Sequence, residues 1–501
     1  MSAARRHALR FAADSGWCPA RVCVLAILLL TGAGCASLDP YAVAPMSVTL
    51  ERDDAVGYCA RLFADIDRRI DALGVRDAES ARIAGFPYLR VDRFSAALAR
   101  RSGDDLQESA WRARLLALDE AARKTELANA DLSIDDLQRC RAMLAEADAS
   151  ASGQLHAAAT VPDNYSLTMR TLGVYPLARV PFAAGVTRWQ TATRSVFATP
   201  LDALPVRGAV RRYVPEQRPL ETQPRLVLDP LGVPVLTAAQ TEALLMRHAP
   251  VLEVDVAASY DEPGTLILDS EDRAVVEGAS PVAYTRFTYT TIGAVIHPQL
   301  VYTFWFSERP ASGELDLLSG RLDGLVWRVT LDADGEPLVY DSMHACGCYH
   351  MFFPTDKVVA RDLPVTLDES LFVPQAVRGP RGGERVTLRV ESGTHYLQRV
   401  QVMQTTASPA PPRKTDAITY SMQDERILTT LRRPTGGTRS AYGSDGLMAG
   451  SERSERWLFW PMGIVSAGQM RQWGHHATAF VGRRHFDDPF LFDTYFEMAG
   501  H

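Results

Sequence analysis

The chain has 501 residues, of which 47% are hydrophobic and 23% are charged, and these are ordinary values for a globular protein. This length is sufficient for two or three domains of the usual size. The formal net charge of −7 argues against general nucleic-acid binding, and against adhesion of the chain as a whole to an anionic membrane surface. We therefore expect no nucleic-acid partner.

The first 34 residues have the composition of an export signal. An apolar run at 22–31 leads through small residues to Cys35, and it follows a basic stretch that contains Arg5, Arg6, Arg10 and Arg21. The apolar run is shorter than the roughly 20 residues of a membrane-spanning helix. This order of basic, apolar and small residues predicts a secretory signal peptide.

The small residues directly before Cys35 make this segment similar to the lipobox of bacterial lipoproteins. The resemblance implies that residues 1–34 are a signal peptide, that Cys35 is acylated, and that residues 35–50 are a lipidated tether. Ala36 after the cysteine implies the outer membrane, so we expect a cell-envelope protein that is attached to a membrane through its N-terminal lipid. An uncleaved membrane anchor and ordinary secretory cleavage are the alternatives, and both also place the body outside the cytoplasm.

The pattern of the remaining chain predicts the α+β class, with an N-terminal helical region followed by a mainly antiparallel β body. Apolar residues recur at three- and four-residue steps over 53–73, which predicts a helix that Gly74 ends. Helices are also expected at 111–130 and, from a capping box, at 133–149. The predicted helical region is 51–150.

Helix signals become rare after residue 160, apart from 238–247, and we expect a mainly antiparallel β domain over 161–402. Hairpins are predicted for 325–331 with 336–340, around Asp332–Gly335, and for 385–390 with 396–402. A Pro/Gly-rich exposed segment follows at 403–450. The aromatic and His-rich segment 451–501 is expected to pack on the β domain. Its aromatic run 457–462 is expected in the core, and contact with a membrane interface or a partner is the alternative.

Four cysteines remain after the predicted signal and Cys35, and an even number in an oxidising compartment favours disulfides. Three pairings are open. Chain distance and local pattern favour one bridge between Cys59 and Cys140 and another between Cys346 and Cys348. The alternative for Cys59 and Cys140 is a pair of small buried hydrophobic residues on helix faces.

One heptapeptide places four potential metal ligands at alternate positions: His344, Cys346, Cys348 and His350. A bend at Gly347 in an otherwise extended strand could bring three or four of them to one ion. Thiolate and imidazole ligands are typical of zinc or copper sites. The C-x-C-x-H order differs from the C-x-x-C-H of covalent haem attachment, so we expect no covalent haem.

Two other interpretations compete with metal binding at this segment. Cys346 and Cys348 could form a strained disulfide, structural or redox-active, or remain buried thiols beside ordinary core histidines. Near the C-terminus, His476 and His485 could add ligands, with Asp487, Asp488, Arg483 and Arg484 nearby, although such residues are more often surface ion pairs. Whether the two clusters meet cannot be read from the sequence.

The chain has no Walker A loop and no dinucleotide fingerprint, so no nucleotide cofactor is expected. Our first functional hypothesis is an exported envelope lipoprotein that binds a metal through the heptapeptide. The alternatives are a structural or interaction lipoprotein with a Cys346–Cys348 disulfide clip, and a thiol–disulfide redox protein. The partner is an envelope protein or a small molecule that the sequence does not identify, and whether the chain is an enzyme stays open.

Overall fold

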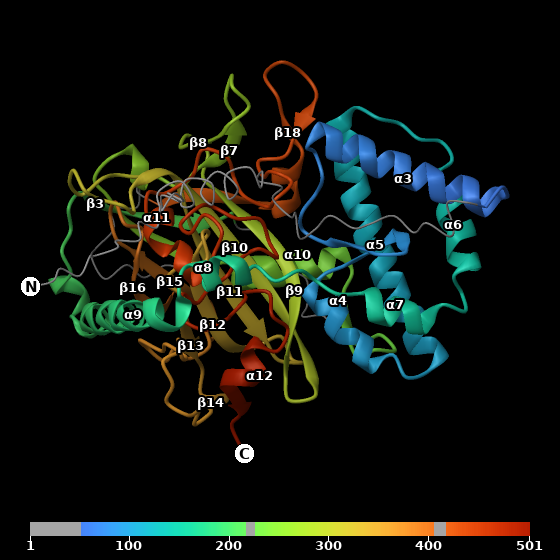
Figure 1. Ribbon diagram of the computed structural model, residues 1–501. Coiled ribbons are helices and arrows are strands. Elements are labelled where there is room, and N and C mark those ends of the chain that lie inside the picture. The colour runs from blue at the N-terminus through green and yellow to red at the C-terminus, as the bar shows by residue number, and fades with distance from the viewer. Residues whose placement is uncertain (1–51, 217–225, 405–416, 501) are drawn as a thin grey trace, which may run out of the picture. The chain divides into compact units, whose positions relative to one another are not determined.

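The computed structural model of the chain describes residues 52–216, 226–404 and 417–500, all of which belong to the unit Val43–His501 (Figure 1). The predicted signal peptide, Cys35 and the tether all lie outside the described residues. Residue 51, the first of the predicted helical region, lies outside them as well. Among the described helices, none is long and apolar enough to cross a membrane. The α+β class is confirmed, because helices and strands both contribute large parts of the fold.

The first part of the described chain is helical, with one small hairpin that the sequence did not predict. The carboxylate of Asp54 accepts a hydrogen bond from the Gly57 N–H at 2.9 Å and caps the first helix, which ends at Gly74 (φ 65°) as expected. The elements are α3 (Ala55–Leu73), β1 (Ala81–Ile83), β2 (Phe86–Val91), α4 (Arg93–Leu98), the 3₁₀ turn η1 (Ala99–Arg101), α5 (Asp105–Ala130), α6 (Leu137–Ala147) and α7 (Ser152–Ala158).

Two of these helices begin elsewhere than predicted. α5 begins well before residue 111, because the Asp104 carboxylate accepts a hydrogen bond from the Gln107 N–H at 2.8 Å and caps the helix there. α6 begins at Leu137 rather than at 133, and the residue before it, Asp136, makes no side-chain cap. The predicted capping box therefore does not start this helix.

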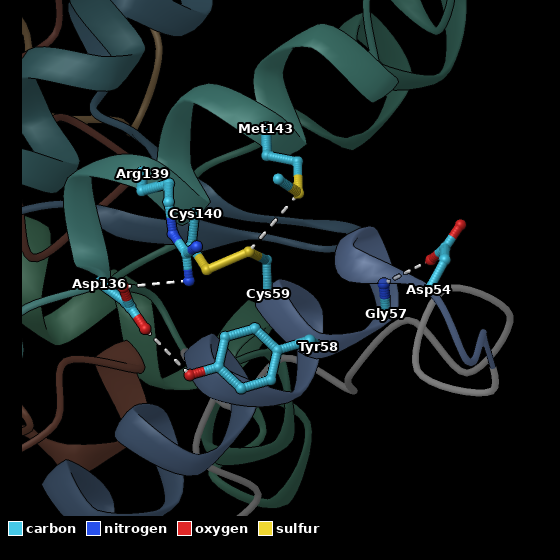
Figure 2. The surroundings of a disulfide bond; sticks show 8 residues. All are labelled: Asp54, Gly57, Tyr58, Cys59, Asp136, Arg139, Cys140 and Met143. Atoms are coloured by element: carbon cyan, nitrogen blue, oxygen red, sulfur yellow. Dashed lines mark hydrogen bonds and ion pairs between the residues drawn. A yellow bond between two sulfur atoms is a disulfide. The ribbon is translucent and has the colours of Figure 1, made fainter.

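The disulfide between Cys59 on α3 and Cys140 on α6 is confirmed (Figure 2). Both cysteines are fully buried, on the apolar faces that the sequence indicated. Beside the bridge, Tyr58 on α3 donates a hydrogen bond to the Asp136 carboxylate at 3.2 Å. The bridge and this contact hold α3 and α6 together.

The segment after residue 160 corrects the prediction of a mainly β region, because it contains α8 (Leu167–Leu172) and the 24-residue helix α9 (Tyr175–Ala198). Only Phe197 of α9 is buried, so the helix has no continuous apolar stripe from which a period could be recognised. Pro176 at its start and Pro181 within it also weaken the helix signal. This long helix was missed for that reason.

Ten strands form the main sheet, in the order β13-β12-β11-β10-β9-β17-β3-β6-β15-β16. Both predicted hairpins are present, β11 with β12 and β15 with β16, and the predicted helix at 238–247 is α10 (Ala238–His248). The strands are β3 (Ala209–Pro215), β6 (Val251–Val256), β9 (Val282–Ile292), β10 (Val295–Arg309), β11 (Gly320–Leu331), β12 (Pro337–His344), β13 (Met351–Pro354), β15 (Glu384–Val390), β16 (Leu397–Gln404) and β17 (Ala417–Asp424).

The main sheet is mixed, which corrects the prediction of a mainly antiparallel body. The pairs β9–β17, β17–β3 and β6–β15 are parallel. Parallel neighbours are joined by long crossovers and not by a short turn. Strand alternation shows which face is buried but not which distant strand lies alongside, so the sequence could not reveal these pairs.

Both faces of the central strands are covered. On β10, Tyr302 and Phe304 pack into one apolar cluster, whereas Val301 and Trp305 pack into another on the opposite face. The remaining elements are η2 (Leu201–Ala203), β4 (Val227–Leu228), β5 (Pro234–Val235), η3 (Ser259–Asp261), β7 (Thr265–Leu268), β8 (Ala274–Glu277), β14 (Val358–Ala360), η4 (Glu425–Thr429), β18 (Leu431–Arg432), β19 (Thr438–Arg439), α11 (Arg456–Phe459), η5 (Trp460–Met462), α12 (Leu491–Tyr495) and β20 (Phe496–Met498).

Candidate functional site

The heptapeptide 344–350 forms a tight turn between β12 and β13. The Gly347 N–H donates to the His344 carbonyl at 2.7 Å, and the His344 N–H donates to the Cys348 carbonyl at 2.9 Å. Gly347 has φ 93°, and a Cβ atom there would lie 2.6 Å from the carbonyl oxygen of Ala477. Only glycine fits this position. The turn replaces the straight strand on which the four predicted ligands would have shared one face.

Both histidines of this turn are buried and held by buried carboxylates. His350 donates from Nε2 to Asp341 at 2.8 Å, and Asp341 also pairs with both ends of the Arg328 guanidinium. His344 lies with Nδ1 3.3 Å from Asp323. Burial lowers the pKa of both imidazoles, that of His350 to about 4, so both are neutral at pH 7.

The second ring nitrogen of each imidazole, His344 Nε2 and His350 Nδ1, is buried without a hydrogen-bond partner among the described residues. In the neutral ring it carries a lone pair. In each case a carboxylate binds one ring nitrogen and fixes the orientation of the imidazole, while the other nitrogen has no partner in the described part of the chain. This arrangement is typical of a histidine that acts as a hydrogen-bond acceptor or a base. Both of these nitrogens are enclosed by the surrounding protein.

Cys346 and Cys348 are neighbouring buried thiols, and no bridge joins them. The Cys348 N–H donates to Cys346 Sγ at 3.4 Å. The hydrogen bond with Cys346, followed by burial, raises the pKa of the Cys348 thiol well above its usual value. The buried guanidinium of Arg471 donates from Nε to the Cys346 carbonyl at 3.1 Å. The predicted Cys346–Cys348 disulfide stays a prediction.

The C-terminal His-rich segment lies against the heptapeptide turn. The Arg471 N–H donates to the Ala345 carbonyl at 3.0 Å, and Ala477 packs on Gly347. Its histidines do not complete a ligand set. His485 binds Asp163 at 3.1 Å, and His476 is buried, which lowers its pKa to about 3.

Among the residues of 52–216, 226–404 and 417–500, no group of three or more His, Cys, Asp or Glu side chains is placed to hold a metal ion. The imidazoles of His344 and His350 each use one nitrogen on a different carboxylate. Zinc or copper binding by the predicted residues therefore stays a prediction that this geometry does not support.

A row of buried ionisable groups that the sequence did not reveal continues from His344. Asp323 binds His344 on one side and His395 Nδ1 on the other at 2.8 Å, and His395 Nε2 lies 3.5 Å from Asp261. Burial alone would lower the pKa of His395, but its hydrogen bonds to Asp261 and Asp323 raise it. Burial would raise the pKa of Asp323, but the charges of and hydrogen bonds from the two histidines hold it well below its usual range.

The turn forms part of the wall of a cavity of about 550 Å³ beneath α9. Its lining is mainly apolar and aromatic and comes mostly from α9, the heptapeptide turn and residues 455–484, with Leu318, Glu369 and Tyr396 from other segments. From α9, Trp189 lies 5.3 Å from the Tyr349 ring of the turn, and Phe182 lies 5.2 Å from the ring of Phe459 (centroid distances). Cys346 and Cys348 also line this cavity.

A few polar groups face the same cavity. One is His350, and another is Glu455, whose burial raises its pKa to about 7 although the charges of Arg453 and Arg309 oppose this. A smaller cavity of about 50 Å³, lined by His344 and Ser342, shares Tyr349 as a wall with the larger one. Both histidines of the turn thus line a cavity.

The sequence singled out the heptapeptide but missed the groups that surround it. Asp323, Asp341 and His395 approach it only through the sheet, and no local spacing marks them. Glu455 and Trp189 belong to segments whose role depends on the fold. β11 and β12 are apolar, buried strands, and each contains an aspartate, Asp323 and Asp341. This pattern could have indicated functional carboxylates, because an acidic residue in an apolar strand requires a partner.

No family model, no curated protein and no solved structure matches this chain. The function is therefore argued from the site itself.

Proposed function

We propose that this chain is an exported, lipid-anchored envelope protein that binds an amphiphilic small molecule in the cavity beneath α9. The cavity carries the proposal. Its volume of about 550 Å³ is within the range of small-molecule sites, and it combines an apolar wall with a few polar groups. The basic, apolar and small residues that precede Cys35 support export and anchoring.

The lining defines the class of ligand. Phe182, Val186 and Trp189 would cover an apolar body, and burial of that body provides the driving force. The Glu455 carboxyl, which lines the cavity, would bind a single polar end. A hydrocarbon chain with a hydroxyl, amide or carboxyl end fits this description.

Photocrosslinking tests the proposal in the full-length protein. p-Benzoylphenylalanine replaces Phe182, a bacterium expresses the chain with its own N-terminal segment, and mass spectrometry identifies the adduct after irradiation. We expect a covalent small-molecule adduct at position 182. The matched control carries the same crosslinker at Leu73, an exposed residue at the end of α3, and should give none.

A cavity-filling variant makes this test specific. Val186 lies on α9, which buries only Phe197, so Val186→Trp should occupy the cavity without disturbing the core. We expect the adduct at position 182 to be lost in this variant. A crosslinked protein without any small-molecule adduct at position 182 would contradict the proposal, as would an adduct of equal yield in Val186→Trp.

Thiol–disulfide exchange is a second candidate function, favoured by the placement of two neighbouring thiols in the cavity wall. In this reaction one thiolate attacks a disulfide of a partner molecule and forms a mixed disulfide with it. The second thiolate then attacks this mixed disulfide and releases the partner's sulfur. Cys346 and Cys348 lose two electrons and two protons as their S–S bond forms, and the two sulfurs of the partner become thiols. Thiols are counted in the folded protein before and after exposure to oxidised glutathione, with Cys346→Ser as the control. A pair that stays reduced and unreactive would exclude this function.

A further inference from the structure

The outer surface of α9 is unusual for a helix of a globular protein. Of its residues, only Phe197 is buried, although the helix is 24 residues long. Near its N-terminus the exposed side chains are apolar: Leu177 is 72% exposed, and Val180 is 52% exposed. Exposed apolar side chains at a helix surface indicate an interaction that the described residues do not provide.

The same surface continues onto two neighbouring segments. On η5 and α11, Trp457 is 72% exposed, and Leu458 and Trp460 are also exposed. These side chains belong to the aromatic run at 457–462 that the sequence placed in the core. This expectation was wrong for them, because the backbone of η5 packs on α8 and α9 and leaves their side chains outside.

Contacts between the segments show that they form one surface region. The Ser166 N–H, at the start of α8, donates to the Gly463 carbonyl after η5 at 2.7 Å. Gly173, between α8 and α9, packs on Pro461, where an added Cβ would lie 2.6 Å from the proline Cα. We name this region the apolar rim, and it consists of Leu167, Leu172, Val174, Leu177, Val180, Trp457, Leu458 and Trp460.

The apolar rim borders the cavity of the proposed function. Leu458 belongs to both, and the rings of Phe182 on α9 and Phe459 on α11, which line the cavity, pack edge to face with their centroids 5.2 Å apart. An apolar molecule that leaves the cavity would thus meet an apolar surface outside it.

The charge of this region is opposite to that of the chain. The segment 164–201 contains four arginines and no acidic residue, in a chain with a net charge of −7. Arg188 and Arg194 are exposed on α9, and Arg456 lies 4.8 Å from the ring of Trp457. Two carboxylates act on these arginines from outside the segment: Asp368 is 3.6 Å from Arg179, and Asp163 interacts electrostatically with Arg170, which is itself buried. The argument from net charge against adhesion to an anionic surface does not apply to this local region.

We propose that the apolar rim docks on a bilayer that contains anionic phospholipids, with α9 in the interfacial plane. Exposed Leu and Trp side chains together with neighbouring arginines are typical of interfacial membrane binding, and basic residues are attracted to an anionic surface. This inference deepens the proposed function, because the bilayer would be the source of the amphiphile. Only this assignment of the source rests on the proposed function. The rim itself requires no ligand in order to dock.

The predicted lipid at Cys35 would add a second attachment to the membrane. Anchoring through one acyl signal is weak, and a second membrane contact strengthens it.

Quenching of tryptophan fluorescence by brominated lipids tests the docking. The full-length protein is reconstituted into vesicles of phosphatidylcholine and phosphatidylglycerol whose acyl chains carry bromine. We expect quenching in these vesicles, and most of it should be lost in Trp457→Phe/Trp460→Phe, which keeps the rim apolar but removes its two reporters. Leu73→Trp, with its added reporter outside the rim, should show no additional quenching.

Two comparisons decide whether the quenching comes from docking of the rim on an anionic bilayer. Arg188→Glu/Arg194→Glu should lower the quenching in anionic vesicles, and vesicles of phosphatidylcholine alone should quench the wild-type protein less. Equal quenching of the wild type and Trp457→Phe/Trp460→Phe would overturn the proposal. This holds even if the protein sediments as a dimer, in which the rim of one copy is covered by the other. If the protein with the crosslinker at position 182 gives no small-molecule adduct but quenching is retained, the proposed ligand is refuted. The proposed docking of the rim on a bilayer then still stands.

Discussion

His350 and Asp341 form a fully buried imidazole–carboxylate pair, joined by a hydrogen bond of 2.8 Å beneath the heptapeptide turn. Burial lowers the pKa of His350 to about 4, although the hydrogen bond to Asp341 opposes this, so the ring is neutral at pH 7. The same effect holds for three further buried histidines, with pKa values of about 3 for His248 and His476 and about 4 for His475. The fold therefore contains several imidazoles that remain unprotonated while it is intact.

These histidines predict that stability falls on acidification. Their pKa values in the folded state lie below the value of about 6.5 in the unfolded chain, so the unfolded chain binds more protons below pH 6.5. Their contribution is complete above pH 6.5 and is lost as the pH falls towards 4, by up to about 1.4 kcal/mol per histidine and pH unit. His395, with a raised pKa, opposes this trend, because its contribution is present below pH 6.5 and is lost as the pH rises through its folded value.

Urea unfolding at pH 7.5 and pH 5 measures this effect. We expect a lower midpoint at pH 5, and a smaller pH dependence in His475→Gln, which removes one of the titrating groups and keeps a donor for the Ala78 carbonyl. Equal midpoints at the two pH values would contradict the assignment of neutral histidines.

Access to the thiols should depend on the character of the reagent. Cys346 and Cys348 line an apolar cavity and are buried, so a small apolar maleimide should modify them faster than an anionic thiosulfonate of similar size. Val186→Trp should slow the apolar reagent by narrowing the same cavity. Labelling of Cys346→Ser/Cys348→Ser provides the background, since Cys59 and Cys140 form a disulfide. Equal rates for the two reagents would show that the thiols react through an opening other than this cavity.

The sequence predicted those features that depend on local pattern. The α3 helix with its Gly74 cap, the Asp332–Gly335 hairpin and the Cys59–Cys140 bridge all follow from periodicity, turn residues or cysteine position. The parallel neighbours of β17 could not be predicted, because they come from strands far away in the chain. α9 was missed because its exposed surface lacks the apolar stripe that normally marks a helix.

The candidate site was predictable only in part, for a related reason. The heptapeptide stands out by composition, but its chemistry depends on partners that the sheet supplies, such as Asp323 and Asp341. A bend at Gly347 was expected to gather a ligand set, and the left-handed Gly347 does produce a turn, but the two imidazoles bind different carboxylates. Tertiary structure therefore determines which partners the heptapeptide side chains have, and so whether the segment is a metal site or a cavity wall.

The Cys59–Cys140 disulfide should contribute strongly to the stability of the helical region. It closes a loop with a sequence separation of 81 residues, and restriction of such a loop in the unfolded chain is worth about 4 kcal/mol. Cys59→Ala/Cys140→Ala should lower the free energy of unfolding by that order, as measured by urea denaturation. Reductant should destabilise the wild type and have no effect on this variant. A reductant effect of the same size in both would place the sensitive bridge elsewhere.

A buried ionic cluster on α5 should tolerate loss of a partner poorly. Glu126 is completely buried and pairs with Arg90 at 2.7 Å, and the removal of one member of a buried pair costs about 3–5 kcal/mol. Glu126→Ala should therefore destabilise the protein by that order. Glu120, half-exposed on the same helix, provides the matched control, because Glu120→Ala should cost less than about 1 kcal/mol. Similar unfolding midpoints for the two variants would contradict the role of this cluster.

Glu455 should make ligand binding sensitive to pH near neutrality. Burial raises the pKa of this cavity-lining carboxyl to about 7. Below pH 7 the neutral acid can donate a hydrogen bond to the polar end of a ligand, whereas above pH 7 the carboxylate retains water in the cavity wall. The yield of the adduct at position 182 should therefore decrease as the pH rises from 6 to 8.

The same carboxyl should lower stability at high pH, which separates its electrostatic role from ligand binding. Its pKa in the folded state lies above its usual value of 4.5, so the unfolded chain releases the proton first, and stability is lost between pH 4.5 and 7. Glu455→Gln should therefore be more stable than the wild type at pH 8, by about 3 kcal/mol if the shift is fully realised. The pH dependence of adduct yield should disappear in this variant. If Glu455→Gln keeps the wild-type pH profile, another ionisable group controls the cavity, and the candidate in its lining is Glu369, whose pKa burial raises.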